Sequence, residues 1–197
     1  MRLYYDRRAP ECDDWYLGKG RFAGQDRPGW GEELGQLAAT IRGLTPDRTL
    51  DVGCGTGFLT RHLRGQVTAL DQSRCMLAIA GNRLPDTIIV QGEATELPFA
   101  TGSFHRVFTS LVFGHLQEDE RTAFLLEARR VANELVVVDA AHAHRPTRPT
   151  TEWQERVLGD GSSWRVYKRY FTADGLRAEL GGGEVLHDGH WFIAVLA

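Results

Sequence analysis

Short apolar runs alternate along most of the chain with segments that are expected to be helical. The apolar runs have the length and β-branched character of buried strands, and they lie at residues 48–52, 66–71, 87–91, 104–110 and 135–139. Helices are expected between them at residues 58–64, 73–82 and 118–131, and Ser73 is suited to cap the second of these. Strands and helices in this order predict an α/β fold with a doubly wound, mostly parallel sheet.

The two ends of the chain extend this pattern. Residues 30–43 place several apolar side chains on one helical face, and Thr172 is suited to cap a helix over residues 172–180. The last segment, residues 183–197, has two apolar runs around Asp188-Gly189, which is a favoured two-residue hairpin turn. We therefore expect a seven-stranded sheet that closes with an antiparallel terminal hairpin strand.

Composition and charge exclude several classes of protein. The 197 residues, with 42% hydrophobic and 25% charged side chains, are ordinary for one globular domain. The net charge of −3 gives no sign of a nucleic-acid or anionic-membrane partner. Lysine occurs only at Lys19 and Lys168, so arginine carries nearly all of the positive charge.

Cysteine usage and the terminal sequence indicate the compartment. Cys12, Cys54 and Cys75 form no CxxC pair, which disfavours a disulfide framework or a zinc site and fits a reducing cytoplasm. The first residues lack the apolar centre of a signal peptide, and no apolar run approaches the ~18–20 residues of a membrane span. The expected location is cytoplasmic, with no membrane partner.

The most informative stretch is Thr49-Leu-Asp-Val-Gly-Cys-Gly-Thr-Gly-Phe58. We expect it to run from a buried strand through a glycine-rich turn into a helix. Glycine permits positive φ and close approach of a ligand, and outward N–H groups at a helix N-terminus suit a nucleotide or a carboxylate. A phosphate-binding GxxxxGK[ST] loop is absent. The dinucleotide pattern GxGxxG also fails, because Phe58 or Thr60 stands where its third glycine is needed.

The pattern Asp-x-Gly-x-Gly-x-Gly, from Asp51 to Gly57, instead resembles the first motif of class I S-adenosylmethionine-dependent methyltransferases of the small-molecule, UbiE-like type. Asp71, 14 residues after Gly57, matches the family's acid that binds both ribose hydroxyls. One carboxylate can accept two hydrogen bonds from a cis-diol. Gly92-Glu-Ala-Thr-Glu-Leu-Pro-Phe99 is similar to the family's motif after the third strand, although Glu replaces the commoner Asp.

The resemblance implies a Rossmann-like fold, S-adenosylmethionine as cofactor and S-adenosylhomocysteine as product. In the implied site, Gly53–Gly57 approaches the amino-acid portion of the cofactor and Asp51 orders the ammonium through water. Glu93 and the Ala94 N–H meet the adenine, on which Met76 packs. The implied cofactor-binding residues are Asp51, Gly53, Cys54, Gly55, Gly57, Asp71, Gln72, Met76, Glu93, Ala94 and Ser110.

We expect one domain across residues 1–197, divided by role. Residues 30–140 form the cofactor-binding core, and residues 1–29 form an N-terminal lid segment. Residues 141–170 are expected to be an irregular, substrate-side insertion over the sheet's edge, and residues 171–197 form the terminal helix and hairpin. The expected assembly is a monomer or a homodimer.

Methyl transfer from a sulfonium requires chiefly that the acceptor atom be aligned for in-line SN2 displacement. A general base is needed only where the acceptor arrives protonated. His115, just after the fourth strand, is the candidate base; the alternative is that it caps or packs beside the next helix. His142 and His144 lack partners at metal-ligand spacing, so we expect no metal.

Several residues are candidates for binding the acceptor. Tyr16, His142 and Trp164 are predicted to contact it, the alternative for the aromatic residues being simple packing. The cations Arg165, Lys168 and Arg169 could bind an anionic substrate, but a solvated face is the favoured interpretation of them.

Motifs that are missing from the sequence indicate which class of molecule accepts the methyl group. No Asn-Pro-Pro-Tyr-like motif follows the fourth strand, where the chain reads Ser110-Leu-Val-Phe113, and no basic face stands out. We therefore predict an enzyme that methylates an O or N atom of a small molecule, without a nucleic-acid partner. The alternatives are methylation of a protein or nucleic acid, and a non-catalytic S-adenosylmethionine-binding regulatory module.

Overall fold

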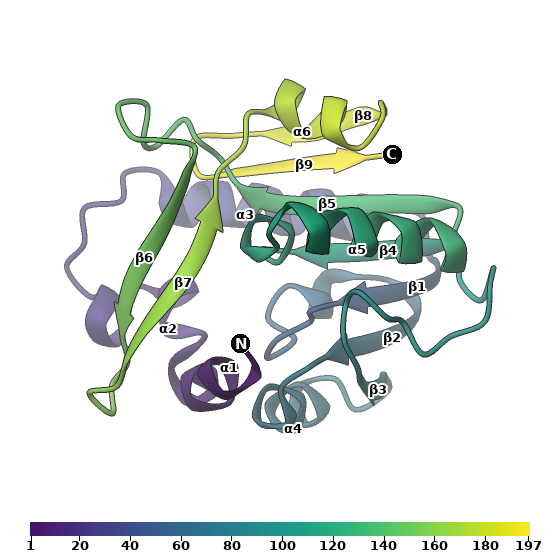
Figure 1. The fold of residues 1–197 in the computed structure, drawn as a ribbon, viewed down its shortest axis with the longest axis horizontal. Coiled ribbons are helices and arrows are strands. Elements are labelled where there is room, and N and C mark those ends of the chain that lie inside the picture. The colour runs from purple at the N-terminus through teal and green to yellow at the C-terminus, as the bar shows by residue number, and fades with distance from the viewer.

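The computed structural model describes residues 1–197 and has a seven-stranded sheet with helices on both faces, plus a separate two-stranded hairpin (Figure 1). The strand order of the main sheet is β3-β2-β1-β4-β5-β9-β8, and only β9 runs opposite to the other six strands. This confirms the predicted doubly wound sheet with an antiparallel terminal hairpin. Its strands are β1 (Asp47–Val52), β2 (Gly65–Asp71), β3 (Ile88–Gln91), β4 (Arg106–Ser110), β5 (Glu134–Ala140), β8 (Glu184–Asp188) and β9 (Phe192–Leu196).

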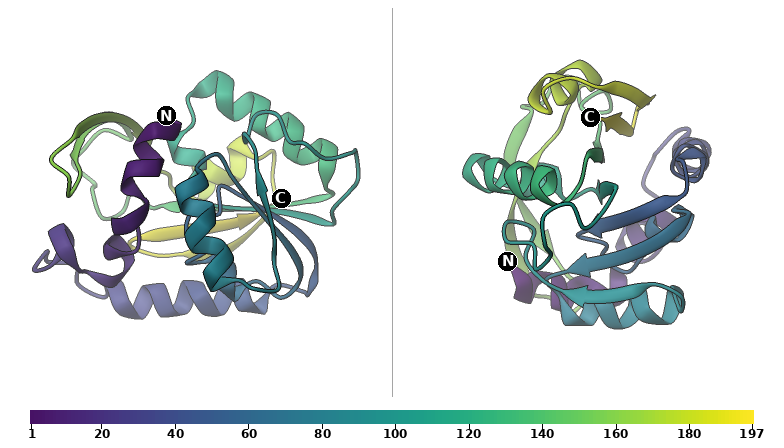
Figure 2. Two further views of the ribbon diagram at one scale, coloured as in Figure 1. Left: turned by 90° about the horizontal axis from the view of Figure 1, so that it is seen from below. Right: turned by 90° about the vertical axis from the view of Figure 1, so that its right-hand side faces the viewer.

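Two layers of helices cover the sheet. Helices α3 (Trp30–Gly43) and α4 (Arg74–Arg83) lie on one face, and α5 (Glu118–Val131) and α6 (Ala173–Glu179) lie on the other (Figures 1 and 2). Successive residues of a strand point to opposite faces, so an uninterrupted apolar strand supplies both layers. None of the helices is both long and apolar enough to cross a membrane.

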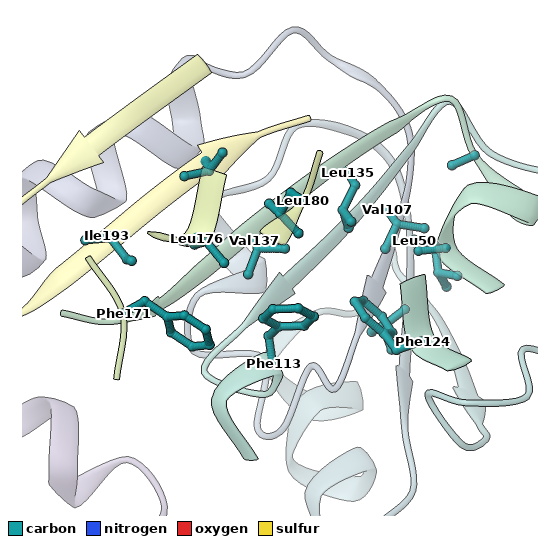
Figure 3. Packing of buried hydrophobic residues seen from close by; sticks show 14 of the residues in the cluster. Leu50, Val107, Phe113, Phe124, Leu135, Val137, Phe171, Leu176, Leu180 and Ile193 are labelled. Carbon is teal, nitrogen blue, oxygen red and sulfur yellow. The ribbon is translucent and has the colours of Figure 1, made fainter. Parts of the chain in front are cut away.

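The larger core lies between the sheet and helices α5 and α6. Phe113, Phe124 and Phe171 pack there against aliphatic side chains of the sheet and α6 (Figure 3). The ring centroid of Phe113 lies 6.0 Å from that of Phe124 and 5.7 Å from that of Phe171. Because Phe113 follows β4 and Phe171 precedes α6, this cluster fixes the loop that leaves β4 at the carboxyl edge of the sheet.

The helix starts agree with the expected caps. The Ser73 hydroxyl accepts a hydrogen bond from the Met76 N–H at 3.1 Å, and the Thr172 hydroxyl accepts one from Gly175 at 3.1 Å. Both bonds satisfy a backbone donor that a helix N-terminus leaves unpaired. Ser73 thereby fixes the start of α4 directly after β2, at the edge where the site is formed.

The helix predicted over residues 58–64 is absent. A single 3₁₀ turn, Thr60–His62, takes its place, followed by extended backbone at Leu63. Since Gly65 pairs beside Asp47, the chain must return along the whole length of β1, about 20 Å at 3.3 Å per residue. A seven-residue helix would span only about 10 Å. With such a helix, the other five residues of the connection would have to cover the rest of the distance and also form the glycine turn. This favours the tighter, more extended path that the structure shows.

Residues 141–170 are also more regular than predicted. They contain the antiparallel hairpin of β6 (Thr151–Val157) and β7 (Ser163–Arg169), in which Thr151 pairs with Arg169. The hairpin stands across the carboxyl ends of the parallel strands (Figure 1). Charged and polar side chains are frequent on both strands, so no apolar run marked them in the sequence. They are frequent because one face of the hairpin meets solvent and the other lines a cavity.

The N-terminal segment packs between this hairpin and the main sheet. It consists of α1 (Arg2–Arg8), α2 (Asp14–Leu17) and two 3₁₀ turns, Ala9–Glu11 and Gly20–Phe22. Helix α1 runs beside α4 (Figure 2). The Tyr4 side chain is fully buried against Leu158 and Val166 of the hairpin, so the segment contributes a small core of its own.

The terminal hairpin has a longer turn than Asp188-Gly189 predicts. Residues 189–191 separate β8 from β9, and the Glu33 carboxylate of α3 organises them. It accepts hydrogen bonds from the N–H groups of Trp191 and Phe192 at 2.8 Å and from that of His190 at 3.0 Å. A distant carboxylate therefore sets this turn, which local turn rules do not consider.

Candidate active site

A cavity of about 1400 Å³ lies at the carboxyl edge of the sheet. Its floor comes from the loops after β1, β2, β3 and β4, and its roof comes from α1, α2 and the β6–β7 hairpin. The strand order reverses between β1 and β4, and ligands of open α/β sheets bind at such a switch point. The cavity has two ends, which we call the cofactor end, around the glycine loop, and the acceptor end, under the hairpin.

The glycine loop after β1 requires glycine where it passes the β4 loop. Gly53 has φ of 75°, and a Cβ atom there would lie 2.3 Å from Cγ2 of Val112. Gly55 has φ of 54° with open space around it, and Gly57 has φ of 76° beside Leu84. Gly53 and Gly55 line the cavity, whereas Gly57 packs beneath it. The absence of a side chain at Gly53 therefore leaves room for the loop after β4, and its absence at Gly57 leaves room for α4 and the residue that follows it.

The N–H groups of this loop point inward, contrary to the expected outward-facing turn. Gly53 and Cys54 donate to the Leu70 carbonyl at 2.7 and 3.0 Å, and Gly55 donates to Oδ2 of Asp71 at 2.9 Å. No helix follows to add its own N-terminal donors. The loop thus lacks the donor cradle that phosphate needs, and the Gly53 carbonyl is left to accept from a cationic ligand.

Asp71 ends β2 and lies at the centre of the cofactor end. Its carboxylate accepts from the Ser73 N–H at 2.8 Å as well as from Gly55, and both bonds hold it in one orientation. Burial raises the pKa of Asp71, while these two N–H groups oppose the rise. Each carboxylate oxygen keeps a second lone pair that can accept from a ligand hydroxyl.

Asp51 lies beneath the loop and does not line the cavity. One of its oxygens accepts from the Thr60 hydroxyl at 2.6 Å, and the other, Oδ1, is buried without a partner. Burial raises the pKa of Asp51 to about 7 despite the Thr60 hydrogen bond, and the charge of Asp71 adds to the rise. A buried carboxylate with an unused oxygen favours a cation or an ordered water above it.

The remaining predicted cofactor residues lie along the same end of the cavity. Met76 is buried in the first turn of α4, Glu93 and Ala94 lie in the loop after β3, and Ser110 ends β4. The arrangement therefore brings together all of the predicted cofactor residues except Asp51 and Gly57. Those that line the cavity are Gly53, Cys54, Gly55, Asp71, Gln72, Met76, Glu93, Ala94 and Ser110.

His115 lies at the acceptor end, in a 3₁₀ turn after β4. Its Nδ1 is 2.7 Å from the Tyr167 carbonyl oxygen, which can only accept. Nδ1 therefore carries the ring proton and Nε2 is left as an acceptor. Burial, together with the charges of Lys168 and Arg156, lowers the pKa of His115 well below its ordinary value. The ring is therefore neutral near pH 7.

The predicted acceptor-contact residues divide into two groups. Tyr16 lines the cavity, with its ring stacked on Phe58 at a centroid distance of 4.1 Å. His142 and Trp164 lie outside it, unlike the prediction. His142 Nε2 faces the Arg148 carbonyl at 2.8 Å, and Trp164 is at the hairpin tip, where Tyr4 covers it at 5.8 Å.

Other residues of the acceptor end were not among the three predicted to contact the acceptor. His144 lines the cavity and packs on Trp191, with ring centroids 4.9 Å apart. Lys168 is buried, not solvated as the sequence allowed, and its Nζ lies 2.6 Å from Oδ1 of Asp139 at the end of β5. Arg156 of β6 also lines this end. An Asp that ends an apolar strand, as Asp139 does, was the one signal that pointed to a buried cation.

The N-terminal segment is fixed to the cofactor end by two acidic side chains. Asp6 accepts from the Ser73 hydroxyl at 2.6 Å, next to the cap of α4. Asp13 accepts from the Thr56 hydroxyl at 2.5 Å and pairs with Arg83. The roof of the cavity is therefore attached to the same loops that form its floor.

Comparisons with known proteins agree with this geometry. A family described as a methyltransferase domain matches residues 50–135. The demethylmenaquinone methyltransferase of Thermotoga maritima is 35% identical over 136 residues, which are 66% of this chain and 56% of that protein. A dTDP-3-amino-3,6-dideoxy-alpha-D-glucopyranose N,N-dimethyltransferase of Streptomyces fradiae is 38% identical over 91 residues, covering 43% of this chain and 35% of that one. The chain thus spans a little over half of the former's length and about a third of the latter's.

Solved structures resemble the chain over nearly its full length. The DhpI–SAM–HEP complex superimposes with a TM-score of 0.72 at 25% identity and covers 98% of this chain and 94% of that one. The DhpI–SAH complex gives a TM-score of 0.71 at 27% identity, with 98% and 92% covered. Fold, switch-point cavity and relatives therefore agree, and the chain belongs to the class I S-adenosylmethionine-dependent methyltransferases.

Proposed function

We propose that the protein transfers the methyl group of S-adenosylmethionine to an oxygen or nitrogen atom of a small molecule by in-line SN2 displacement. The observation that carries this proposal is the continuity of the cavity. One space joins the glycine loop and Asp71 to a chamber under the β6–β7 hairpin. A donor held at the first end would direct its methyl group toward an acceptor held at the second.

The residues of the cofactor end fit S-adenosylmethionine. Asp71 has the lone pairs to accept from both ribose hydroxyls, and Met76 offers an apolar surface to the adenine. The unused Gly53 carbonyl and the unpartnered Oδ1 of Asp51, the latter through water, suit the ammonium group. The inward-facing loop N–H groups fit a cofactor without phosphate, and the bound sulfonium supplies an activated methyl group.

At the acceptor end the protein's own task is to position and to exclude water. His115 has an unprotonated Nε2 in the cavity, so it can accept a hydrogen bond from a hydroxyl or amine acceptor. Its lowered pKa makes it a weak base, which suits orientation of the acceptor more than removal of its proton. Tyr16 supplies an aromatic wall.

The shape of the site supports a small acceptor. The roof places α1, α2 and the hairpin over the carboxyl edge of the sheet, which favours a small acceptor over a macromolecule. The two relatives named above methylate small molecules by their names. Within one domain, residues 1–29 and 141–170 would provide this roof, residues 30–140 the cofactor-binding core, and residues 171–197 its closing edge.

Calorimetry with S-adenosylhomocysteine tests the cofactor half of the proposal. Asp71→Ala should weaken binding at least tenfold, because hydrogen bonds to a charged group worth about 1.5–3 kcal/mol are lost. Asp188→Ala, which removes an exposed carboxylate outside the cavity, is the matched control and should bind normally. Equal affinity in Asp71→Ala and the wild type would remove Asp71 from the site.

Transfer is tested by incubating the protein with radiolabelled S-adenosylmethionine and a cell extract, followed by separation by size. Label should enter small solutes. Label recovered only in protein or nucleic acid would contradict the small-molecule acceptor, and tight binding of S-adenosylhomocysteine without transfer to any fraction would contradict catalysis.

A further inference from the structure

The acceptor end contains an arginine whose charge has no acidic partner. Arg156 lies half-buried on β6 and lines the cavity. Its guanidinium donates to Oε1 of Gln154 at 2.7 and 3.1 Å and to the Tyr4 hydroxyl at 3.2 Å. Both partners are neutral. The buried Arg106 and Arg121, in contrast, each pair with a glutamate, at 2.6 and 2.7 Å.

This unpaired charge is held in a fixed position. The three hydrogen bonds to Gln154 and Tyr4 use the Nε, Nη1 and Nη2 atoms of Arg156 and prevent it from swinging to solvent. A guanidinium has five N–H donors, so two remain for a ligand. Removing a cation from water without a counter-charge is costly, and a built, oriented cation of this kind is typical of an anion site.

Further cationic side chains line the cavity together with Arg156. Lys168 and Arg8 line the cavity as well, and the charges of Lys168, Arg156 and Arg8 all act on the His115 ring. Asp139 neutralises Lys168, but it leaves two of the three ammonium donors unused. The carboxylates of the cavity lie elsewhere: Asp71 and Glu93 are at the cofactor end, and Asp26 and Glu120 are exposed residues.

We infer that the methyl acceptor carries an anionic group, a carboxylate or a phosphoryl group, and that Arg156 binds this group. The inference rests on the proposed function, since it describes the acceptor of the same reaction. A guanidinium presents parallel donors that match two oxygens of either group. Lys168 adds a second positive charge farther along the hairpin: Arg156 of β6 pairs with Trp164, and Lys168 lies four residues after Trp164 on β7, opposite Glu152.

The test is a calorimetric titration of the protein already saturated with S-adenosylhomocysteine. The probes are acetate for the carboxylate source and methylphosphonate and inorganic phosphate for the phosphoryl source, with acetamide as the neutral analogue. We expect saturable binding of one class of anion, at least tenfold tighter than acetamide. Which class binds decides between the two sources.

Two substitutions on the hairpin make the test specific. Arg156→Gln should weaken binding of that anion at least tenfold and leave binding of S-adenosylhomocysteine unchanged. Arg165→Gln removes an exposed arginine from the neighbouring strand, outside the cavity, and should change neither. Should Arg156→Gln fail to fold, Tyr4→Phe removes only one hydroxyl that orients the guanidinium, and a two- to threefold weakening is expected.

The failures of the two proposals are distinguishable. If S-adenosylhomocysteine binds but no anion binds better than acetamide, or if Arg156→Gln binds the anion as the wild type does, the anionic acceptor is refuted and the proposed function stands. If S-adenosylhomocysteine itself does not bind, the proposed function fails first.

Discussion

The two ends of the cavity are built by different means. At the cofactor end, the glycine loop and Asp71 follow adjacent parallel strands, and backbone hydrogen bonds from Gly53 and Gly55 hold them together. At the acceptor end, α1, β5, β6 and β7 converge from opposite ends of the chain. Side chains hold this end together, above all the Lys168–Asp139 pair.

This difference indicates which parts of the site tolerate change. The geometry of the cofactor end follows from the register of the strands, because backbone hydrogen bonds hold it. Proteins with the same sheet therefore share this geometry. A side-chain-built end can be altered by single substitutions without disturbing the sheet. The cofactor end therefore suits the common donor of a family, and the acceptor end suits a substrate that differs between members.

The largest effect is expected from breaking the ion pair that joins the hairpin to β5. Lys168→Met leaves the fully buried Asp139 without its cation and should lower the free energy of unfolding by about 3–5 kcal/mol. Urea denaturation monitored by fluorescence measures the change. Arg165→Met, an exposed neighbour on the same strand, should stay within about 0.5 kcal/mol of the wild type. A Lys168→Met protein as stable as this control would show that the pair does not hold the roof.

Combining Lys168→Met with Asp139→Asn sharpens the comparison. The double variant removes both charges, so it should recover part of the stability lost in the single variant. Additive losses from the two substitutions would contradict direct coupling between these side chains.

The next effect concerns the backbone of the cofactor end. Gly53→Ala places a Cβ atom 2.3 Å from Val112 and forces a left-handed conformation, and it should cost about 3 kcal/mol of stability. Gly55→Ala has a similar φ but open space, so it should cost only the conformational part, about 1–2 kcal/mol. Equal losses in the two variants, measured by thermal denaturation, would mean that contact with Val112 is unimportant.

The same contrast explains what could be predicted from the sequence. The mostly parallel sheet with its antiparallel terminal strand and the caps at Ser73 and Thr172 follow from local patterns, and the structure bears them out. The cofactor residues form short motifs at strand ends, so sequence spacing brought most of them to one cavity. The helix over residues 58–64 failed because a non-local requirement, the return path to Gly65, overrode local preference.

The acceptor end could not be predicted in the same way. Trp164 and Lys168 lie on the same face of β7. Trp164 is near the hairpin tip, where Tyr4 covers it, whereas Lys168 is four residues farther along the strand and lines the cavity. Which part of the hairpin is covered depends on where α1 packs. Tyr4 of α1 contacts Arg156 of the hairpin although 152 residues separate them in the chain. His142 and His144 differ similarly, since the bond from His142 to the Arg148 carbonyl depends on the path of the following loop.

The smallest predicted effect tests the link between Asp51 and the cofactor's ammonium. The folded-state pKa of about 7 lies above the ordinary value of 3.8, so ionisation of Asp51 opposes folding and its contribution to stability falls as pH rises between these values. A cationic ligand above Asp51 favours the ionised form. Because only about a tenth of Asp51 is ionised at pH 6, S-adenosylhomocysteine should bind about tenfold more tightly at pH 8 than at pH 6. Calorimetry at both pH values measures this, with Asp51→Asn as the variant that should lose the dependence; the same slope in both proteins would detach Asp51 from the ligand.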